Sequence, residues 1–172
     1  NRMTIKILSV DDEKHMESLI RQMFRKQIRQ KKFEFFFAQN GIQALELLKK
    51  HKDISLILSD INMPEMDGLT LLSKLIDLNN PLLTAIMISA YGDMDNIRSA
   101  MNKGAFDFIT KPINFKDLEL TLDKTVMHIQ QLKESQEKEM KLSALEYDLD
   151  IAKDIQRAML PKKFPPRKGG NF

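Results

Sequence analysis

The stretch ISLILSDINMPEMDG, residues 54–68, places an aspartate, Asp60, directly after an apolar run and follows it with a turn rich in Met, Pro, Asp and Gly. Four more short apolar runs occur along the chain, at residues 4–10, 33–38, 83–89 and 106–110. Most of the five runs are too uniformly apolar to keep one face in water, which is typical of strands buried on both sides of a parallel sheet. We therefore interpret residues 54–59 as a buried strand with Asp60 at its carboxyl end.

Segments with helical spacing separate these runs. Four of them are expected to form helices: residues 15–28, 42–50, 68–78 and 94–104. Asn40 is a suitable N-cap for the second helix, and Gly104 is placed as a C-terminal stop for the fourth. Strands that alternate with helices predict an α/β fold with a doubly wound, five-stranded parallel sheet.

The chain changes character from Asn114 onward. Residues 114–117 carry a capping signal, and no Gly or Pro follows until after Leu160. A helix of this length would extend roughly 65 to 70 Å, further than a domain of this size, so we expect it to leave the domain.

Residues that are mostly apolar recur along this segment in alternating steps of four and three, as in a coiled coil. They form two blocks, which are Leu118, Leu122, Thr125, Ile129 and Leu132, and then Leu142, Leu145, Leu149, Ala152, Gln156 and Met159. The phase slips in the polar stretch between the blocks. We interpret residues 115–160 as an extended coiled-coil linker through which the protein forms a homodimer. The alternative is an amphipathic helix that folds back on its own domain.

Composition limits the classes of function. A length of 172 residues suits one domain with an appendage, and 42% hydrophobic with 30% charged residues argues against disorder. The absence of cysteine excludes disulfides and thiolate metal sites. No apolar run approaches the roughly 20 residues of a membrane span, and the N-terminus lacks a signal-peptide pattern. We expect a cytoplasmic protein that binds no membrane.

Net charge argues against a nucleic-acid partner. The formal charge is only +3, and the basic residues between Arg21 and Lys32 have no exposed aromatic residues among them. We interpret this group as a solvated helix face and expect no nucleic-acid binding.

Acidic residues stand at two of the predicted strand ends. Asp11 and Asp12 follow the first strand, and Asp60 follows the third. Ligands of an open parallel sheet bind beyond the carboxyl ends of strands, where the strand order reverses. If the first and third strands are neighbours there, three carboxylates converge, and their repulsion calls for a cation. Oxygen ligands without histidine favour Mg²⁺.

Two further strand ends supply other functional groups. Ser89 ends the fourth strand with a hydroxyl, and Lys111 ends the fifth with an ammonium. A carboxylate nucleophile, a divalent cation, a hydroxyl and a lysine are the groups needed to accept a phosphoryl group. A metal-dependent phosphohydrolase with Asp60 as nucleophile would use the same groups and is one alternative.

Taken together, these motifs resemble the receiver domain of two-component response regulators. The resemblance runs from residue 3 to residue 124 and rests on four motifs in order, which are the acid pair at Asp11, DINMPEMDG from Asp60, SA at Ser89 and KP at Lys111. It implies a flavodoxin-like fold. It also implies that a sensor histidine kinase phosphorylates Asp60.

The resemblance also implies a magnesium site. Asp12, Asp60 and the backbone carbonyl of Asn62 would ligate the ion, and Asp11 would support its water shell. Asn62 and Tyr91 match positions that tune the access of water to the acyl phosphate in the family, so the lifetime of the phosphorylated state cannot be read from the sequence.

The remaining matched positions would respond to the phosphoryl group. Ser89 and Lys111 would contact its oxygens, and Ser89 would act as a switch residue together with Phe108. Receivers often carry Tyr or Phe at the latter position as a rotating ring. Phe108 has no hydroxyl, so we expect it to switch by burial.

The output of such a receiver is suggested by residues 148–166, DLDIAKDIQRAMLPKKFPP. This stretch resembles the entry segment of PPM-type serine phosphatase domains of the bacterial stress-response class. It implies that residues 161–172 begin a truncated output domain, and that a phosphoprotein is its downstream substrate. The catalytic acids of such a domain do not appear. A receiver that controls a nucleotide cyclase or a DNA-binding module is the alternative, and residues 161–172 would then be a tail.

Overall fold

The computed structural model describes residues 3–160, and the sheet within them follows the predicted alternation of strands and helices. All neighbouring strands are parallel, in the order β2-β1-β3-β4-β5. The strands are β1 (Ile5–Val10), β2 (Phe33–Ala38), β3 (Leu56–Asp60), β4 (Thr84–Ala90) and β5 (Asp107–Lys111). The helices are α1 (His15–Met23), α2 (Arg25–Arg29), α3 (Gly41–Lys50), α4 (Gly68–Ile76), α5 (Met94–Asn102) and α6 (Phe115–Met159). The predicted doubly wound α/β fold is confirmed.

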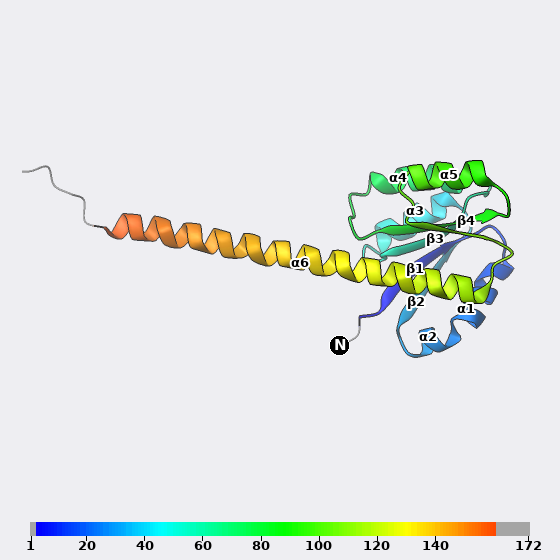
Figure 1. Cartoon of the computed structure of the whole chain (residues 1–172), viewed down its shortest axis with the longest axis horizontal. Coiled ribbons are helices and arrows are strands. Elements are labelled where there is room, and N and C mark those ends of the chain that lie inside the picture. The colour runs from blue at the N-terminus through cyan, green and yellow to red at the C-terminus, as the bar shows by residue number, and fades with distance from the viewer. Residues whose placement is uncertain (1–2, 161–172) are drawn as a thin grey trace, which may run out of the picture. The chain divides into compact units, whose positions relative to one another are not determined.

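Helices cover both faces of the sheet (Figure 1). Helices α3, α4 and α5 lie on one face, where two clusters of buried side chains join them to the sheet. Helices α1, α2 and the first part of α6 lie on the other face, over a single cluster. Strands β1, β3 and β4 are buried on both sides, which explains their uniformly apolar sequences.

The helix expected at residues 15–28 is interrupted at Phe24. This residue has φ −107° and ψ 22°, which separates α1 from α2. Its ring is fully buried, with its centroid 5.6 Å from that of Phe35 and 5.7 Å from that of Phe115. The expectation of one continuous helix was wrong, because the helical spacing of apolar residues continues through Phe24 and gives no sign of the break.

The first part of α6 belongs to the compact unit that extends to Lys133. Leu118, Leu122, Thr125 and Ile129 are buried in the core of this unit. The interpretation of this first block as a coiled-coil seam was therefore wrong. For these residues, the alternative of a helix that packs on its own domain is correct.

The second unit begins at Glu134, and its described part is helical to Met159. Every side chain from Glu134 to Leu160 is exposed. The expected start of an output domain at residues 161–172 lies outside the described residues. Among the helices in the described part of the chain, none combines the length and the apolar character needed to cross a membrane.

Candidate functional site

The strand register brings the predicted site residues to one edge of the sheet. Val10 of β1 pairs with Ser59 of β3, so the residues that follow each of them, Asp11 and Asp60, are neighbours. On the other side of β3, Asp60 pairs with Ile88, which precedes Ser89. The first and third strands are thus adjacent, which is the arrangement that the predicted cluster of three carboxylates needs.

Three carboxylates meet at this edge. Each of Asp11, Asp12 and Asp60 offers an oxygen, and these oxygens lie within 4.8 Å of one another. Asp11 and Asp60 are buried, whereas Asp12 is exposed. Burial raises the pKa of Asp11, and the negative charge of Asp60 raises it further, although the Glu13 backbone N–H, which donates to Asp11 Oδ1 at 2.8 Å, works in the opposite direction. The site therefore holds more negative charge than its own groups can neutralise.

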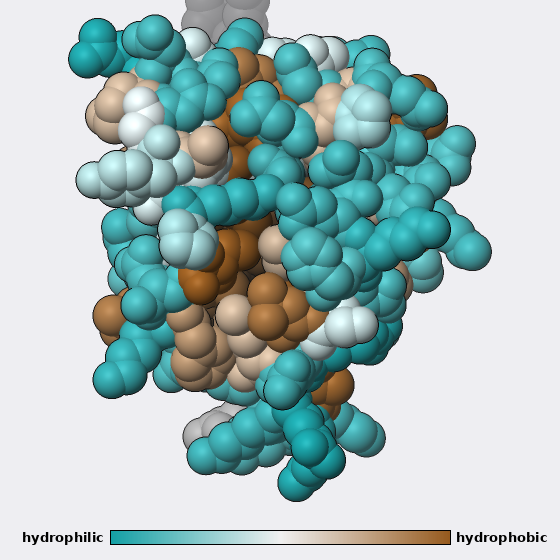
Figure 2. All heavy atoms as spheres, turned by 90° about the vertical axis from the view of Figure 1, so that its right-hand side faces the viewer, coloured by the Kyte–Doolittle hydropathy of each residue, from teal (hydrophilic) through white to brown (hydrophobic). Residues whose placement is uncertain are grey.

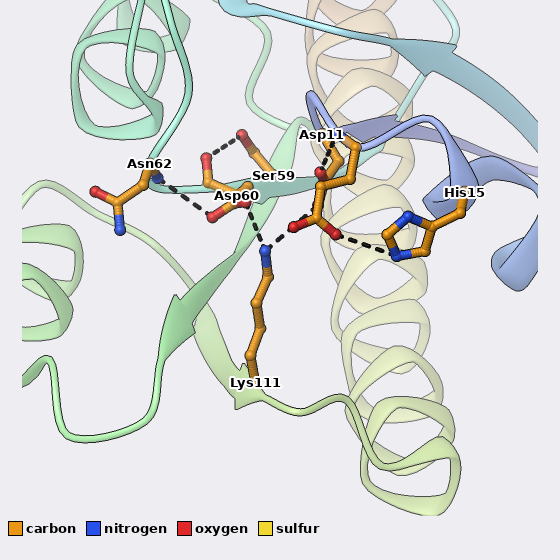
Figure 3. A network of polar contacts seen from close by, with 7 residues as sticks. Asp11, His15, Ser59, Asp60, Asn62 and Lys111 are labelled. Carbon is orange, nitrogen blue, oxygen red and sulfur yellow. Dashed lines mark hydrogen bonds and ion pairs between the residues drawn. The ribbon is translucent and has the colours of Figure 1, made fainter.

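Lys111 is the cation that the chain supplies to this cluster. Its Nζ lies 2.8 Å from Asp60 Oδ2 and 3.8 Å from Asp11 Oδ2. Figure 3 shows the lysine side chain rising from β5 and ending between the two acids. Burial lowers the pKa of Lys111, but the hydrogen bond to Asp60 and the nearby carboxylates outweigh burial and raise it above its ordinary value. The lysine is therefore protonated at neutral pH.

The turn after β3 fixes the other side of Asp60. The backbone N–H of Asn62 donates to Asp60 Oδ1 at 3.2 Å. At Gly68, a Cβ would lie 2.3 Å from the backbone oxygen of Asp60 and 2.8 Å from Ile61 Cα, so no larger residue fits without a backbone shift. Gly68 also donates its N–H to the Ile61 carbonyl at 2.7 Å. The DINMPEMDG motif thus forms a close-packed turn that holds Asp60 in place.

Ser89 and Phe108 lie on the neighbouring strands. The hydroxyl of Ser89 is fully buried and has no hydrogen-bond partner among residues 3–160. Phe108 of β5 is half-buried, and its backbone pairs with Met87 of β4. A buried hydroxyl without a partner is unusual and costs free energy, so a group that enters the site would find a ready donor in Ser89.

The sequence analysis missed two residues at the mouth of the site, Glu13 and His15. His15 Nε2 lies 3.2 Å from Glu13 Oε2, and the charge of Glu13 also raises the pKa of Lys111. In the sequence, only the position of Glu13 directly after the acid pair could have indicated that it lies beside the site.

The residues present fit a magnesium ion. Their donor atoms are all oxygens, which Mg²⁺ prefers. Asp11 Oδ2 is buried and accepts no hydrogen bond from any residue that the structure describes. A divalent cation would satisfy this oxygen and reduce the repulsion between Asp11 and Asp60.

Figure 2 views the molecule from the side on which α6 begins, which is also the side on which the strands end. Most of this face is hydrophilic, with hydrophobic residues gathered in a hollow near its centre.

Comparison with known proteins gives matches over the same region. The family model described as response regulator receiver domain matches residues 7–123. Sporulation initiation phosphotransferase F of Bacillus subtilis is 34% identical over 118 residues, which are 67% of this chain and 89% of that protein. A response regulator receiver domain protein from Clostridium thermocellum has a solved structure with a TM-score of 0.67 and 25% identity, covering 74% of this chain and 98% of that one.

A longer relative matches only in part. The DNA-binding transcriptional regulator NtrC of Escherichia coli K12 is 39% identical over 93 residues, or 54% of this chain. This chain spans 19% of the length of that regulator.

Proposed function

Because the chain belongs to the response regulator receiver domain family, we propose that Asp60 accepts a phosphoryl group from the phosphohistidine of a sensor histidine kinase. The observation that supports this most directly is the contact between Lys111 Nζ and Asp60 Oδ2 at 2.8 Å, within a cluster of three carboxylates. This arrangement holds a nucleophile rigidly and places a cation beside it, as phosphoryl transfer requires.

In the proposed step, a carboxylate oxygen of Asp60 forms a bond to phosphorus while the bond from phosphorus to the donor imidazole nitrogen breaks. The imidazole takes up a proton and leaves as a neutral group. Lys111 and Ser89 contact the phosphoryl oxygens, where a cation and a hydroxyl donor offset the charge that develops. Both side chains extend from strands that end at this edge of the sheet.

Asp12, Asp60 and the backbone carbonyl of Asn62 would hold the magnesium ion, and Asp11 would support its water shell. The ion, when bound, neutralises charge on the acids and on the incoming phosphoryl group. The crowding of carboxylate oxygens within 4.8 Å supports this assignment.

Phosphorylation adds nearly two negative charges at the end of β3. We expect Ser89 and Lys111 to be drawn toward these charges and the half-buried ring of Phe108 to become more buried. Such repacking of β4 and β5 is the proposed switch.

The signal then passes through α6, as part of a homodimer, to an output domain. We propose a PPM-type serine/threonine phosphatase that acts on a phosphoprotein, on the basis of the resemblance in residues 148–166. A DNA-binding output is the second candidate, favoured by the similarity to NtrC, which is a DNA-binding transcriptional regulator. The complete coding sequence of the gene decides between them, since a phosphatase domain requires paired metal-binding aspartates and a DNA-binding module does not.

The site assignment is tested by the intact mass of the chain after treatment with a small phosphoryl donor, such as acetyl phosphate, and Mg²⁺. We expect a gain of one phosphoryl group, lost in Asp60→Asn and retained in Asp95→Asn, which changes an exposed acid of α5. Equal labelling of both variants would contradict the assignment. Multiple turnovers of a small phosphate ester would instead favour the phosphohydrolase alternative.

A further inference from the structure

The exposed part of α6 carries a regular row of side chains, apolar except for Gln156, which is here called the leucine seam. It consists of Leu142, Leu145, Leu149, Ala152, Gln156 and Met159. The steps between these residues alternate strictly between three and four, which keeps the row on one side of a supercoiled helix. Leu142, Leu145 and Leu149 are each more than half exposed, at 58%, 57% and 54%. Large side chains repeated in this way indicate a surface that pairs with another helix.

A second row with the same alternating spacing also exists on this helix but is interrupted by a charged residue. It contains Met140, Ala144, Tyr147, Ile151 and Ala158. Ile151 lies roughly half a turn around the helix from Leu142, so the two rows face different directions. Asp154 occupies the place in the second row where the next apolar residue would be needed. Burying the charged Asp154 without a partner would cost more than burying the neutral amide of Gln156 in the leucine seam, so the leucine seam is the better surface for pairing.

Charged residues on either side of the leucine seam indicate what binds there. In the heptad notation for coiled coils, Lys141 and Asp148 occupy g positions just before the seam residues Leu142 and Leu149. Glu146 and Lys153 occupy e positions just after the other seam residues. In a parallel pair of identical helices, a g residue lies beside the e residue five positions later in the other chain.

This rule gives two attractive pairs on each side of a self-pairing. Lys141 would lie beside Glu146 of the second copy, and Asp148 beside Lys153 of the second copy. The next pair in the series, Ile155 with Leu160, is apolar on both sides. Each flanking position thus meets a group that complements it.

An antiparallel pair fits less well. In that orientation g residues face g residues and e residues face e residues, so Glu146 would meet Lys153 of the other copy, but Lys141 could be neutralised only by Asp148 of the other copy. When the whole seam overlaps, these two residues are displaced by about 12 positions, or roughly 18 Å along the axis. The charge pattern therefore favours a parallel, in-register partner.

We propose that the leucine seam binds the leucine seam of a second copy of this chain in a parallel, in-register pair specified by the contacts Lys141–Glu146 and Asp148–Lys153. This inference rests on the homodimer within the proposed function and adds its surface, orientation and register. The first block of α6 takes no part, because its residues are buried in the core of the domain, except for the half-buried Leu132.

Single cysteines test the orientation, since the chain has no cysteine of its own. In the parallel pair the two copies of residue 142 face each other, so Leu142→Cys should form an intermolecular disulfide under mild oxidation by dioxygen. Ile151→Cys is the matched control on the second row and should remain monomeric on a non-reducing gel. Crosslinking of Ile151→Cys but not of Leu142→Cys would overturn the proposed seam.

Charge variants test the register. One variant, Lys141→Glu with Lys153→Glu, makes all four flanking positions acidic, and another, Glu146→Lys with Asp148→Lys, makes them all basic. We expect each variant alone to be monomeric in sedimentation at concentrations where the parent chain is dimeric, and a 1:1 mixture to form heterodimers. Circular dichroism should show the same helix content for the acidic variant as for the basic variant.

These measurements distinguish the proposed dimer from the proposed phosphorylation of Asp60, and the proposed register from the dimer itself. A parent chain that stays monomeric at every concentration would overturn both the seam and the homodimer, while phosphorylation of Asp60, measured by mass, would stand. A parent dimer that is indifferent to the charge changes would overturn only the register.

Discussion

The ammonium of Lys111 lies 2.8 Å from Asp60 Oδ2, although the two residues are 51 positions apart and their strands are separated by β4. The lysine reaches across the end of the intervening strand, where its backbone pairs with Ala90, the residue after Ser89. The proposed nucleophile and its cation are therefore joined before any phosphoryl group arrives.

Lys111→Met is expected to slow the uptake of a phosphoryl group from acetyl phosphate by about 100-fold, because the variant loses the cation that offsets charge in the transition state. The rate is measured from intact mass against time. Lys124→Met is the control, since Lys124 is an exposed lysine that pairs with Asp107 and lies over the Phe106 ring, and it contacts neither Asp60 nor Asp11. Equal rates in the two variants would argue against a role for Lys111 in transfer.

Gly68→Ala is expected to lower the free energy of unfolding by about 3 kcal/mol, because the added Cβ would meet the backbone of Asp60 and Ile61. It should also slow phosphorylation, since the turn that holds Asp60 must shift. Gly41→Ala is the control, because there the Cβ meets the flexible side chain of Met66. Urea titration of both variants checks the difference, and an equal loss of stability would contradict it.

The candidate site could be predicted from the sequence because it depends on a simple property of parallel sheets. Carboxyl ends of neighbouring strands share one edge, so Asp11, Asp60, Ser89 and Lys111 could be expected there once their runs were read as strands. Their direct contacts could not be predicted. The reach of Lys111 to Asp60 depends on rotamers and on the strand register, which the pattern of apolar residues leaves open.

Two predictions about helices were wrong, the continuous helix over residues 15–28 and the first coiled-coil block of α6, and both have one physical cause. Steps of three and four place residues on one face of a helix but do not say what covers that face. Leu118 and Leu122 follow the same spacing as Leu142 and Leu145, yet the first two are fully buried against the domain and the last two are exposed. The break at Phe24 was missed for a related reason, since only its tertiary contacts with Phe35 and Phe115 distinguish it from an ordinary helical residue.

Ser89→Ala is expected to leave the stability of the unphosphorylated protein unchanged or slightly raised, because the hydroxyl is buried without a partner within the described residues. Ser59→Ala is a matched control. Its hydroxyl is also buried but donates to the Asp60 carbonyl at 3.0 Å, so its loss should cost about 1 kcal/mol. Thermal unfolding of the two variants checks the order, and a larger loss for Ser89→Ala would show that its hydroxyl is already paired.

Asp11→Asn is expected to stabilise the metal-free protein at neutral pH. Burial raises the pKa of Asp11 in the folded state above its ordinary value of 3.8, so the folded state binds this proton more tightly than the unfolded state. The resulting contribution to stability is fully present below pH 3.8 and is lost as pH rises through the folded-state pKa. The stability advantage of Asp11→Asn over the parent, measured by urea titration in a chelator, should therefore be small near pH 3.8 and grow as pH increases. The asparagine can still accept the hydrogen bond from the Glu13 N–H, so the local geometry is retained.

Added Mg²⁺ should reverse this order, because an ion that binds only the folded parent raises its unfolding free energy, whereas Asp11→Asn has lost one of the acids that support the ion. Asp95→Asn, on the exposed face of α5, should behave like the parent at every pH and metal concentration. A stability gain for Asp11→Asn that is independent of pH, or that persists unchanged in Mg²⁺, would mean that the repulsion between Asp11 and Asp60 is not what the ion relieves.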